Sequence, residues 1–162
     1  MKITVFYDSR TNNTATMAQY IVDGMTTVEG VEAKAFNITE IDEEFAKASD
    51  AFVFGSPTYA AGPTAEMYNF LLNQTRQYPF AGKLAGVFAT EQFIHGGADV
   101  TMLRMAETLL VKGMMIYSGG GSWGMPVIHF GPVEVSPDTE AFKDLFTVYG
   151  ERFAKQALKV TK

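Results

Sequence analysis

The sequence predicts a doubly wound α/β fold, in which helices cover both faces of a parallel five-stranded sheet. Short apolar runs alternate with longer segments whose apolar residues recur at helical spacing, in the order βαβαβαβαβα. The chain of 162 residues suits one compact domain, which we expect to span residues 1–162. Hydrophobic residues make up 47% of it, which is enough to fill a core between helices and sheet.

The first three elements follow from their apolar patterns. Residues 3–7 form a short apolar run with β-branched side chains, which predicts a buried strand. Residues 14–25 predict a helix, since their apolar side chains recur every three or four positions, at Met17, Ala18, Ile21, Val22 and Met25. Residues 31–36 alternate apolar and polar side chains, which predicts a half-exposed strand.

The middle of the chain continues the alternation. Residues 39–48 are acidic and predict a short helix with Thr39 as its cap. Residues 51–55 read AFVFG, which predicts a second buried strand, and the turn residues Ser56 and Pro57 follow it. Residues 65–72 predict another helix.

The last third of the chain predicts two strands and two helices. The apolar runs 84–89 and 114–117 predict strands, and residues 99–112 repeat apolar side chains at helical spacing. Residues 139–158 predict a final amphipathic helix, while residues 118–137 are rich in turn residues and predict a loop. Ligands of such folds bind at the carboxyl ends of the strands, so we expect a site in the loops after residues 7, 55 and 89.

Composition excludes several classes of function. The net charge of −5 and the absence of any Lys or Arg cluster argue against a nucleic-acid partner. The absence of cysteine excludes disulfides, thiolate metal sites and a cysteine nucleophile. The first apolar stretch is too short for a signal peptide, and no stretch approaches a membrane span. We therefore expect a cytoplasmic protein without a membrane partner.

The loop at residues 9–14, SRTNNT, is crowded with small polar side chains. It lies where a strand ends and a helix begins, and there backbone N–H groups and the helix dipole favour an anion. Its hydroxyl and amide groups predict a phosphate cup without a lysine. The alternative is an ordinary helix cap supplied by Asn13 or Thr11, with the other polar groups solvated.

Other motifs of this topology do not fit. The loop has neither the glycines and lysine of a P-loop nor the three glycines of a dinucleotide fingerprint. A glycine pattern of the second kind occurs at residues 119–124, GGGSWG, but no helix is expected there. A phosphorylation receiver domain is rejected because no Asp follows the third strand. No metal site is expected, because the consecutive acids at residues 42–44 suit a solvated helix face.

Three loops together resemble those of flavodoxin-like proteins. SRTNNT resembles their phosphate loop, commonly Ser/Thr-x-Thr-Gly-x-Thr, with Asn12 in place of the glycine and Arg10 at a variable position. FGSPTYAAGPTAEMYNFL at 54–71 resembles their Gly-Thr/Ser-Pro-Thr-hydrophobic segment. Residues 82–114 are similar to the NAD(P)H:quinone oxidoreductase branch named for the Trp-repressor-binding protein WrbA. The resemblance covers most of residues 1–117 and implies a flavodoxin-like three-layer sandwich with strand order 2-1-3-4-5.

The resemblance also implies a bound FMN, with its phosphate on residues 9–14 and its isoalloxazine ring between loops 57–62 and 90–97. Tyr59 and Phe93 are the aromatic residues best placed to cover a ring face, and Trp123 is a third candidate. The implied cofactor-binding residues are Ser9, Arg10, Thr11, Asn12, Asn13, Thr14, Pro57, Thr58, Tyr59, Ala60, Ala61, Gly62, Thr90, Glu91, Gln92, Phe93, His95, Gly96 and Gly97.

Two side chains in the third loop could influence the redox reaction of the flavin. His95 is the candidate catalytic residue, as a proton donor or a hydrogen-bond partner of a quinone oxygen, and an exposed loop histidine is the alternative. Glu91 near the ring would disfavour an anionic reduced flavin.

Two functions follow from the resemblance. One is an FMN-dependent oxidoreductase that takes hydride from NAD(P)H and reduces a quinone or a flavin. The other is a flavodoxin-type electron carrier that docks on a redox protein partner. Carriers are commonly strongly acidic and the charge here is modest, which favours the oxidoreductase. The sequence does not distinguish a monomer from a homodimer or tetramer. A third possible function is a non-redox binding domain that keeps the fold.

Overall fold

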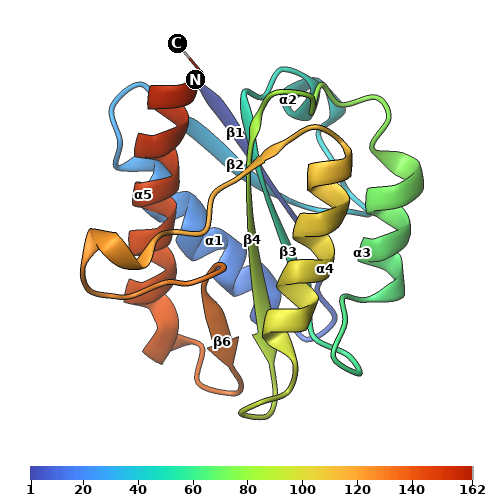
Figure 1. Cartoon of the computed structure of the whole chain (residues 1–162), viewed down its shortest axis with the longest axis vertical. Helices are drawn as coiled ribbons and strands as arrows, with labels where there is room; N and C mark the ends of the chain where they lie inside the picture. Colours follow the sequence, from blue (N-terminus) through green and yellow to red (C-terminus); the bar gives the residue numbers. More distant parts are fainter. Residues whose placement is uncertain (162) are drawn as a thin grey trace.

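The computed structural model describes residues 1–161, which form a parallel sheet covered by helices on both faces (Figure 1). The strands are β1 (Lys2–Tyr7), β2 (Glu32–Asn37), β3 (Ala51–Pro57), β4 (Leu84–Glu91), β5 (Met115–Ile116) and β6 (Val133–Val135). The α-helices are α1 (Asn13–Thr26), α2 (Glu43–Lys47), α3 (Ala65–Asn69), α4 (Ala98–Val111) and α5 (Lys143–Val160). Short turns of other helix types lie at η1 (Phe70–Gln74), η2 (Gly121–Trp123) and η3 (Glu140–Phe142).

The first five strands are ordered β2-β1-β3-β4-β5, which confirms the expected order 2-1-3-4-5. β1 lies between β2 and β3, with Val5 opposite Ala35 of β2 on one side and Val53 of β3 on the other, both in parallel register. The chain therefore moves outward from β1 to β2, then returns to build the other half from β3. This reversal leaves a crevice at the carboxyl ends of β1 and β3, where doubly wound sheets bind ligands.

A sixth strand, β6, lies inside the segment 118–137 that was expected to be only a loop. β4 is eight residues long, and β5 pairs with its beginning, Leu84 opposite Met115. β6 pairs in parallel with its end, Thr90 opposite Glu134. The expectation was wrong here because three residues carry too little periodicity to be recognised, and the pairing partner is distant in the sequence.

Two helix starts also differ from the expectation. α2 begins at Glu43, because the Asp42 carboxylate accepts a hydrogen bond of 3.0 Å from the Phe45 N–H and caps the helix. Thr39, the expected cap, instead donates its N–H to the Asn37 side chain in the preceding turn. The last helix begins at Lys143, after the separate turn η3. GGGSWG forms the short turn η2 and starts no longer helix.

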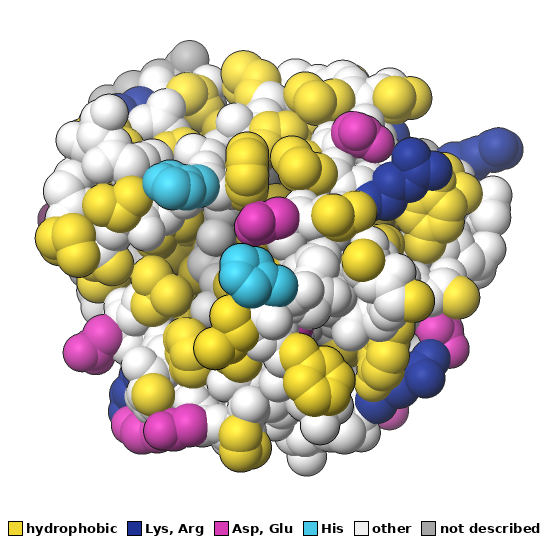
Figure 2. Space-filling model, turned by 60° about the horizontal axis from the view of Figure 1, so that its bottom comes forward, with side chains coloured by type: hydrophobic (Ala, Val, Ile, Leu, Met, Phe, Trp, Pro, Cys, Tyr) yellow, Lys and Arg dark blue, Asp and Glu magenta, His cyan; other side chains and the backbone are white. Residues whose placement is uncertain are grey.

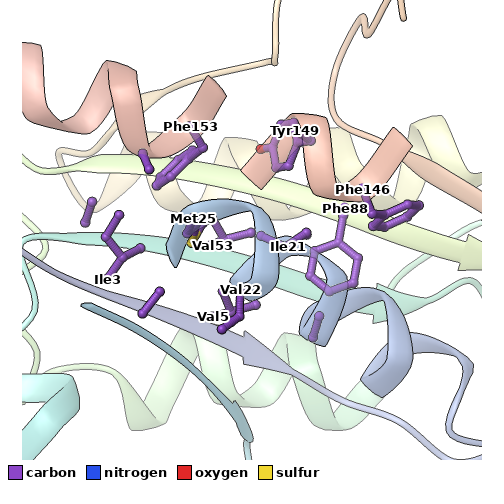
Figure 3. Packing of buried hydrophobic residues seen from close by; sticks show 14 of the residues in the cluster. Ile3, Val5, Ile21, Val22, Met25, Val53, Phe88, Phe146, Tyr149 and Phe153 are labelled. Carbon is purple, nitrogen blue, oxygen red and sulfur yellow. The ribbon is translucent and has the colours of Figure 1, made fainter. Parts of the chain in front are cut away.

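Alternating side chains of the sheet supply two cores. On one face, α1 and α5 pack on β-branched residues such as Val5 and Val53, with Phe146, Tyr149 and Phe153 filling the layer (Figure 3). The opposite face, under α3 and α4, is largely aromatic, with Phe6, Phe52, Phe54, Phe70, Tyr78 and Phe80 in mutual contact. The many aromatic residues of the sequence are therefore mostly core. Within residues 1–161, no helix has the length and apolar character to cross a membrane.

Candidate functional site

A cavity of about 540 Å³ lies at the carboxyl ends of the strands, where the predicted loops meet. Its lining residues are Thr11, Asn13, Pro57, Thr58, Tyr59, Ala60, Thr90, Glu91, Gln92, Phe93, Gly96, Ser136 and Pro137. Figure 2 looks toward this end of the molecule, where hydrophobic side chains are scattered over the face and the Lys and Arg side chains lie away from the middle of the view. Among the described residues, no Lys or Arg lines the cavity.

The first loop leaves the start of α1 open toward a ligand. Asn12 adopts the left-handed conformation, with φ of 68°, and its side chain makes no capping hydrogen bond. The first turn of α1 carries no acidic side chain. The first N–H groups of a helix have no partner within the helix, so this end is suited to an anion.

The cap expected as the alternative, by Asn13 or Thr11, is wrong. Ser9 Oγ accepts a hydrogen bond of 3.3 Å from the Ala15 N–H, and the Asn12 carbonyl accepts one of 2.9 Å from the Thr16 N–H. Asn13 instead donates its side-chain N–H to Ser136 at 2.6 Å.

Thr14 ties the loop to the end of β4. Its hydroxyl lies 2.9 Å from the Thr90 hydroxyl, and both residues are buried. Only one hydrogen can lie between two hydroxyl oxygens, so the other hydroxyl keeps a hydrogen to donate elsewhere. The Thr14–Thr90 pair therefore anchors the loop and leaves one hydroxyl hydrogen, on whichever threonine accepts, for a further partner.

The second loop is a tight turn with a strained backbone. Tyr59 and Gly62 exchange hydrogen bonds of 2.9 and 3.1 Å, and the two alanines between them, Ala60 and Ala61, have φ of 49° and 56°. Residues other than glycine rarely adopt positive φ, and such strain concentrates at functional sites. The adjacent Thr58 hydroxyl is a buried oxygen without a partner among the described residues, and Thr58 lines the cavity.

The third loop is held by Glu91. Its carboxylate accepts a hydrogen bond of 3.0 Å from the Ala98 N–H, at the start of α4. The negative charge lies at the positive end of the helix dipole, which stabilises both groups. Glu91 lines the cavity as expected, and it also fixes the loop that carries Phe93 and Gly96.

Glycines bring the second and third loops together. A Cβ on Gly97 would lie 2.5 Å from the Ala61 side chain, and the φ of Gly97 is +102°. A Cβ on Gly96 would lie 2.8 Å from the Glu91 carboxylate. These close contacts explain why glycines occupy both positions.

We expect Gly97→Ala to separate these two loops. The added methyl group meets Ala61 and must adopt a positive φ, which together cost about 2 kcal/mol of unfolding free energy. Ligand affinity should fall with the displaced loops. Urea unfolding and flavin titration measure both effects, with Gly121→Ala as control because its Cβ meets only Val127 at 3.4 Å. An unchanged flavin affinity in Gly97→Ala would contradict the expected coupling of the loops.

Of the predicted binding residues, eleven line the cavity and the others lie beside it. The lining set is Thr11, Asn13, Pro57, Thr58, Tyr59, Ala60, Thr90, Glu91, Gln92, Phe93 and Gly96. Ser9, Arg10, Asn12, Thr14, Ala61, Gly62, His95 and Gly97 belong to the same loops without lining it. His95 is exposed with a φ of 63°, and its catalytic role stays a prediction.

Arg10 is directed toward the second loop and α3. Its guanidinium is 2.9 Å from the Glu66 carboxylate and lies over the Tyr59 ring, 5.1 Å from the ring centroid. Both side chains of the ion pair are about half exposed, so the pair itself adds little stability. Its position beside Tyr59 instead orients an aromatic side chain of the cavity.

Of the three aromatic residues expected to cover a ring face, Tyr59 and Phe93 lie at the cavity and Trp123 does not. Tyr59 and Phe93 line the cavity and are 47% and 67% exposed, which is high for such side chains. Trp123 does not line the cavity, and the Lys159 ammonium lies over its ring at 5.1 Å. A flat ligand would therefore meet Tyr59 and Phe93 and not Trp123.

Three residues at the cavity were not predicted from the sequence: Ser136, Pro137 and Glu134. Ser136 and Pro137 line the cavity, and Glu134 is fully buried next to them on β6. Burial raises the pKa of the Glu134 carboxyl group, and the hydrogen bond from Ser136 partly opposes this shift. A charged residue between two valines, followed by Ser-Pro, was the available signal.

The raised pKa of Glu134 predicts a pH-dependent stability difference. Between the unfolded and folded pKa values the folded state holds the proton and the unfolded state does not, so wild-type stability falls as pH rises through this window. Gln cannot ionise, so Glu134→Gln should gain stability relative to wild type as pH rises above about 4.5, the usual range of a Glu. Urea unfolding from pH 4 to 7.5 measures the difference; a pH-independent difference would contradict it.

Fold and site together define a doubly wound α/β protein with a ligand cavity at its topological switch point. The family model for flavodoxin matches residues 5–90, and the chain is 33% identical over 160 residues to a flavodoxin of Clostridium saccharobutylicum, with 99% of each chain covered. This chain belongs to the flavodoxin family.

Two further comparisons extend this result. The chain is 33% identical over 143 residues to an NAD(P)H dehydrogenase (quinone) of Trichlorobacter lovleyi, covering 71% of this chain and 70% of the relative. It also shares its fold with the crystal structure of a flavodoxin, WrbA-like protein from Agrobacterium tumefaciens, with a TM-score of 0.80 at 21% identity over 98% of each chain.

Proposed function

We propose that this protein binds FMN in the carboxyl-end cavity and acts as a flavodoxin-type electron carrier for a redox protein partner. The observation that carries the proposal is the cavity itself, which combines a helix start whose N-cap side chain, Asn12, makes no capping hydrogen bond with exposed aromatic side chains. The full-length match to a flavodoxin supports the carrier over the oxidoreductase that the sequence alone favoured.

The first loop suits the phosphate group of FMN. The start of α1 has no acid in its first turn and no capping hydrogen bond from Asn12, and the loop carries hydroxyl groups at Thr11 and Thr14. Neutral donors at a helix start bind phosphate without a lysine, which agrees with the absence of Lys and Arg from the described lining. Asn13 would add a side-chain contact from the same turn.

The second and third loops suit the isoalloxazine ring. Tyr59 and Phe93 present exposed aromatic surface, while the buried Thr58 hydroxyl lacks a partner that a polar ring edge could supply. FMN supplies the electron-transfer chemistry, and the protein contributes binding, orientation and nearby charge. The Glu91 carboxylate is an acidic side chain of the cavity lining and would oppose accumulation of negative charge on a bound ring.

An exposed site favours a carrier because electrons must pass to a second protein. Phe93 and the neighbouring Ile94, 67% and 79% exposed, form an apolar rim at the third loop. The net charge of −5 is modest for a carrier, but its sign would attract a basic partner. The exposed rim therefore suits a transient redox complex.

A second candidate is an FMN-dependent oxidoreductase with NAD(P)H as donor and a quinone or flavin as acceptor. The match to an NAD(P)H dehydrogenase (quinone) over 71% of the chain favours it. His95 would then be the candidate to meet the acceptor, since it lies in the exposed third loop.

One spectroscopic experiment separates these functions. The purified protein, supplied with FMN, should be yellow and should bleach with dithionite or a flavodoxin reductase, but not within minutes of adding NADH or NADPH without oxygen. Rapid bleaching by NAD(P)H alone would establish the oxidoreductase instead. A protein that stays colourless with excess FMN would overturn both.

A further inference from the structure

Glu134 is a fully buried carboxyl group next to the proposed cofactor site. It lies on β6 opposite Thr90, and its exposed fraction is 0%. One carboxyl oxygen, Oε2, accepts a hydrogen bond of 3.2 Å from the Ser136 hydroxyl. The other, Oε1, has no partner among the described residues. A buried carboxyl group with one partner is costly, so a specific role is needed to explain it.

The hydrogen bonds continue from Glu134 to the first loop. The Ser136 hydroxyl oxygen accepts a hydrogen bond of 2.6 Å from the Asn13 side-chain amide. An amide N–H can only donate and a carboxylate can only accept, so the directions run from Asn13 to Ser136 and from Ser136 to Glu134. Ser136 is itself fixed, because its backbone N–H donates to the Glu91 carbonyl at 2.8 Å.

This chain of bonds joins the two sides of the cavity. Asn13 is the first residue of α1 and Ser136 follows β6, and both line the cavity. Without an acceptor at Glu134, the Ser136 hydroxyl would be free to turn its hydrogen in other directions and would no longer be committed to accept from Asn13. The orientation of the Asn13 side chain would then be less restricted.

We propose that Glu134 is a positioning residue for the phosphate loop, acting through Ser136 to hold Asn13 in the orientation that meets the FMN phosphate. The proposal rests on the proposed binding of FMN in this cavity. It assigns Glu134 no contact with the cofactor. The Thr14–Thr90 contact anchors the same loop independently, so the loop keeps one anchor when Glu134 is changed.

The test compares FMN with riboflavin, which lacks the phosphate. Dissociation constants are measured by flavin fluorescence for wild type, Glu134→Met, Glu134→Gln, Ser136→Ala, Asn13→Ala and the double variant Glu134→Met with Asn13→Ala. Met keeps the length of Glu without its oxygens, whereas Gln keeps an acceptor for Ser136. Glu44→Met removes an exposed carboxylate on α2 and serves as the matched control.

We expect Glu134→Met and Ser136→Ala to weaken FMN about 5- to 10-fold, the effect of one hydrogen bond, and to leave riboflavin unchanged. Glu134→Gln and Glu44→Met should bind FMN like wild type. In the Asn13→Ala background, Glu134→Met should add no further loss, because its effect passes through Asn13.

Equal losses for FMN and riboflavin, or additive losses in the double variant, would overturn the positioning role and leave Glu134 as part of general packing. If Glu134→Met does not fold, Ser136→Ala decides by the same comparison. Failure of the proposed function looks different, because wild type would then bind neither flavin.

Discussion

Replacing Thr11 and Thr14 together with alanine is expected to weaken FMN binding by about 100-fold or more while the fold persists. Each hydroxyl that donates to a charged group contributes about 1.5 kcal/mol or more, and the two losses add to at least about 3 kcal/mol. Thr11 lines the cavity, and Thr14 shares a hydrogen with Thr90 at 2.9 Å. Flavin fluorescence titration measures the affinity.

Controls must separate a loss of folding stability from a loss of contacts to the FMN phosphate. Thr14 is buried, so its loss also costs about 1 kcal/mol of stability, which urea unfolding measures. Thr26→Ala, at the other end of α1, removes an exposed threonine and should leave FMN affinity unchanged. Riboflavin affinity should change little. If FMN affinity is unchanged in the double variant, the loop is only a helix start.

Gly150→Ala is expected to lower the free energy of unfolding by about 3 kcal/mol, because α1 and α5 touch backbone to backbone. A Cβ at Gly150 would lie 2.1 Å from the Ile21 carbonyl oxygen, and a Cβ at Gly24 would lie 1.9 Å from the Thr147 carbonyl oxygen. Alanine gains about 1 kcal/mol in helix propensity over glycine, which the steric overlap outweighs. The helices would have to move apart.

The displaced helix would disturb the core layer in which Phe146 and Phe153 pack (Figure 3). For a domain of this size, 3 kcal/mol corresponds to a fall in Tm of about 6–12 °C. Differential scanning calorimetry measures it, with Gly121→Ala as the control because its Cβ has room. A Tm within about 2 °C of wild type would show that the two helices can separate at little cost.

The apolar and polar pattern of the sequence was enough to predict the fold class and most of the loops that line the cavity. Residues 3–7 and 51–55 were recognisable as strands by their apolar runs, and the structure places β1 and β3 there. Loops after parallel strands meet at one edge of the sheet, so the sequence alone predicted that SRTNNT and the loops at 57–62 and 90–97 lie together. The sequence was weaker for short elements such as β6, whose three residues carry no periodicity.

The remaining features depend on partners far apart in the chain. Arg10 pairs with Glu66 and overlies Tyr59, although its position in the loop suggested a phosphate contact. Gly97 is required by its contact with Ala61, which no pattern near residue 97 reveals. Neither contact follows from spacing, because each depends on the angle at which two loops meet.

The amino-acid pattern alone predicted the alternation of the first five strands with helices, the edge of the sheet where a ligand is expected, and the polar loop that starts α1. These follow from periodicities of two and 3.6 residues and from the rule that parallel strands share one carboxyl edge. The folded chain was needed to show that Asn13 bonds to Ser136 across 123 positions and, through it, reaches the buried Glu134. The physical reason is that a hydrogen bond requires two groups within about 3 Å, and here the pairing of β6 with β4 brings them together.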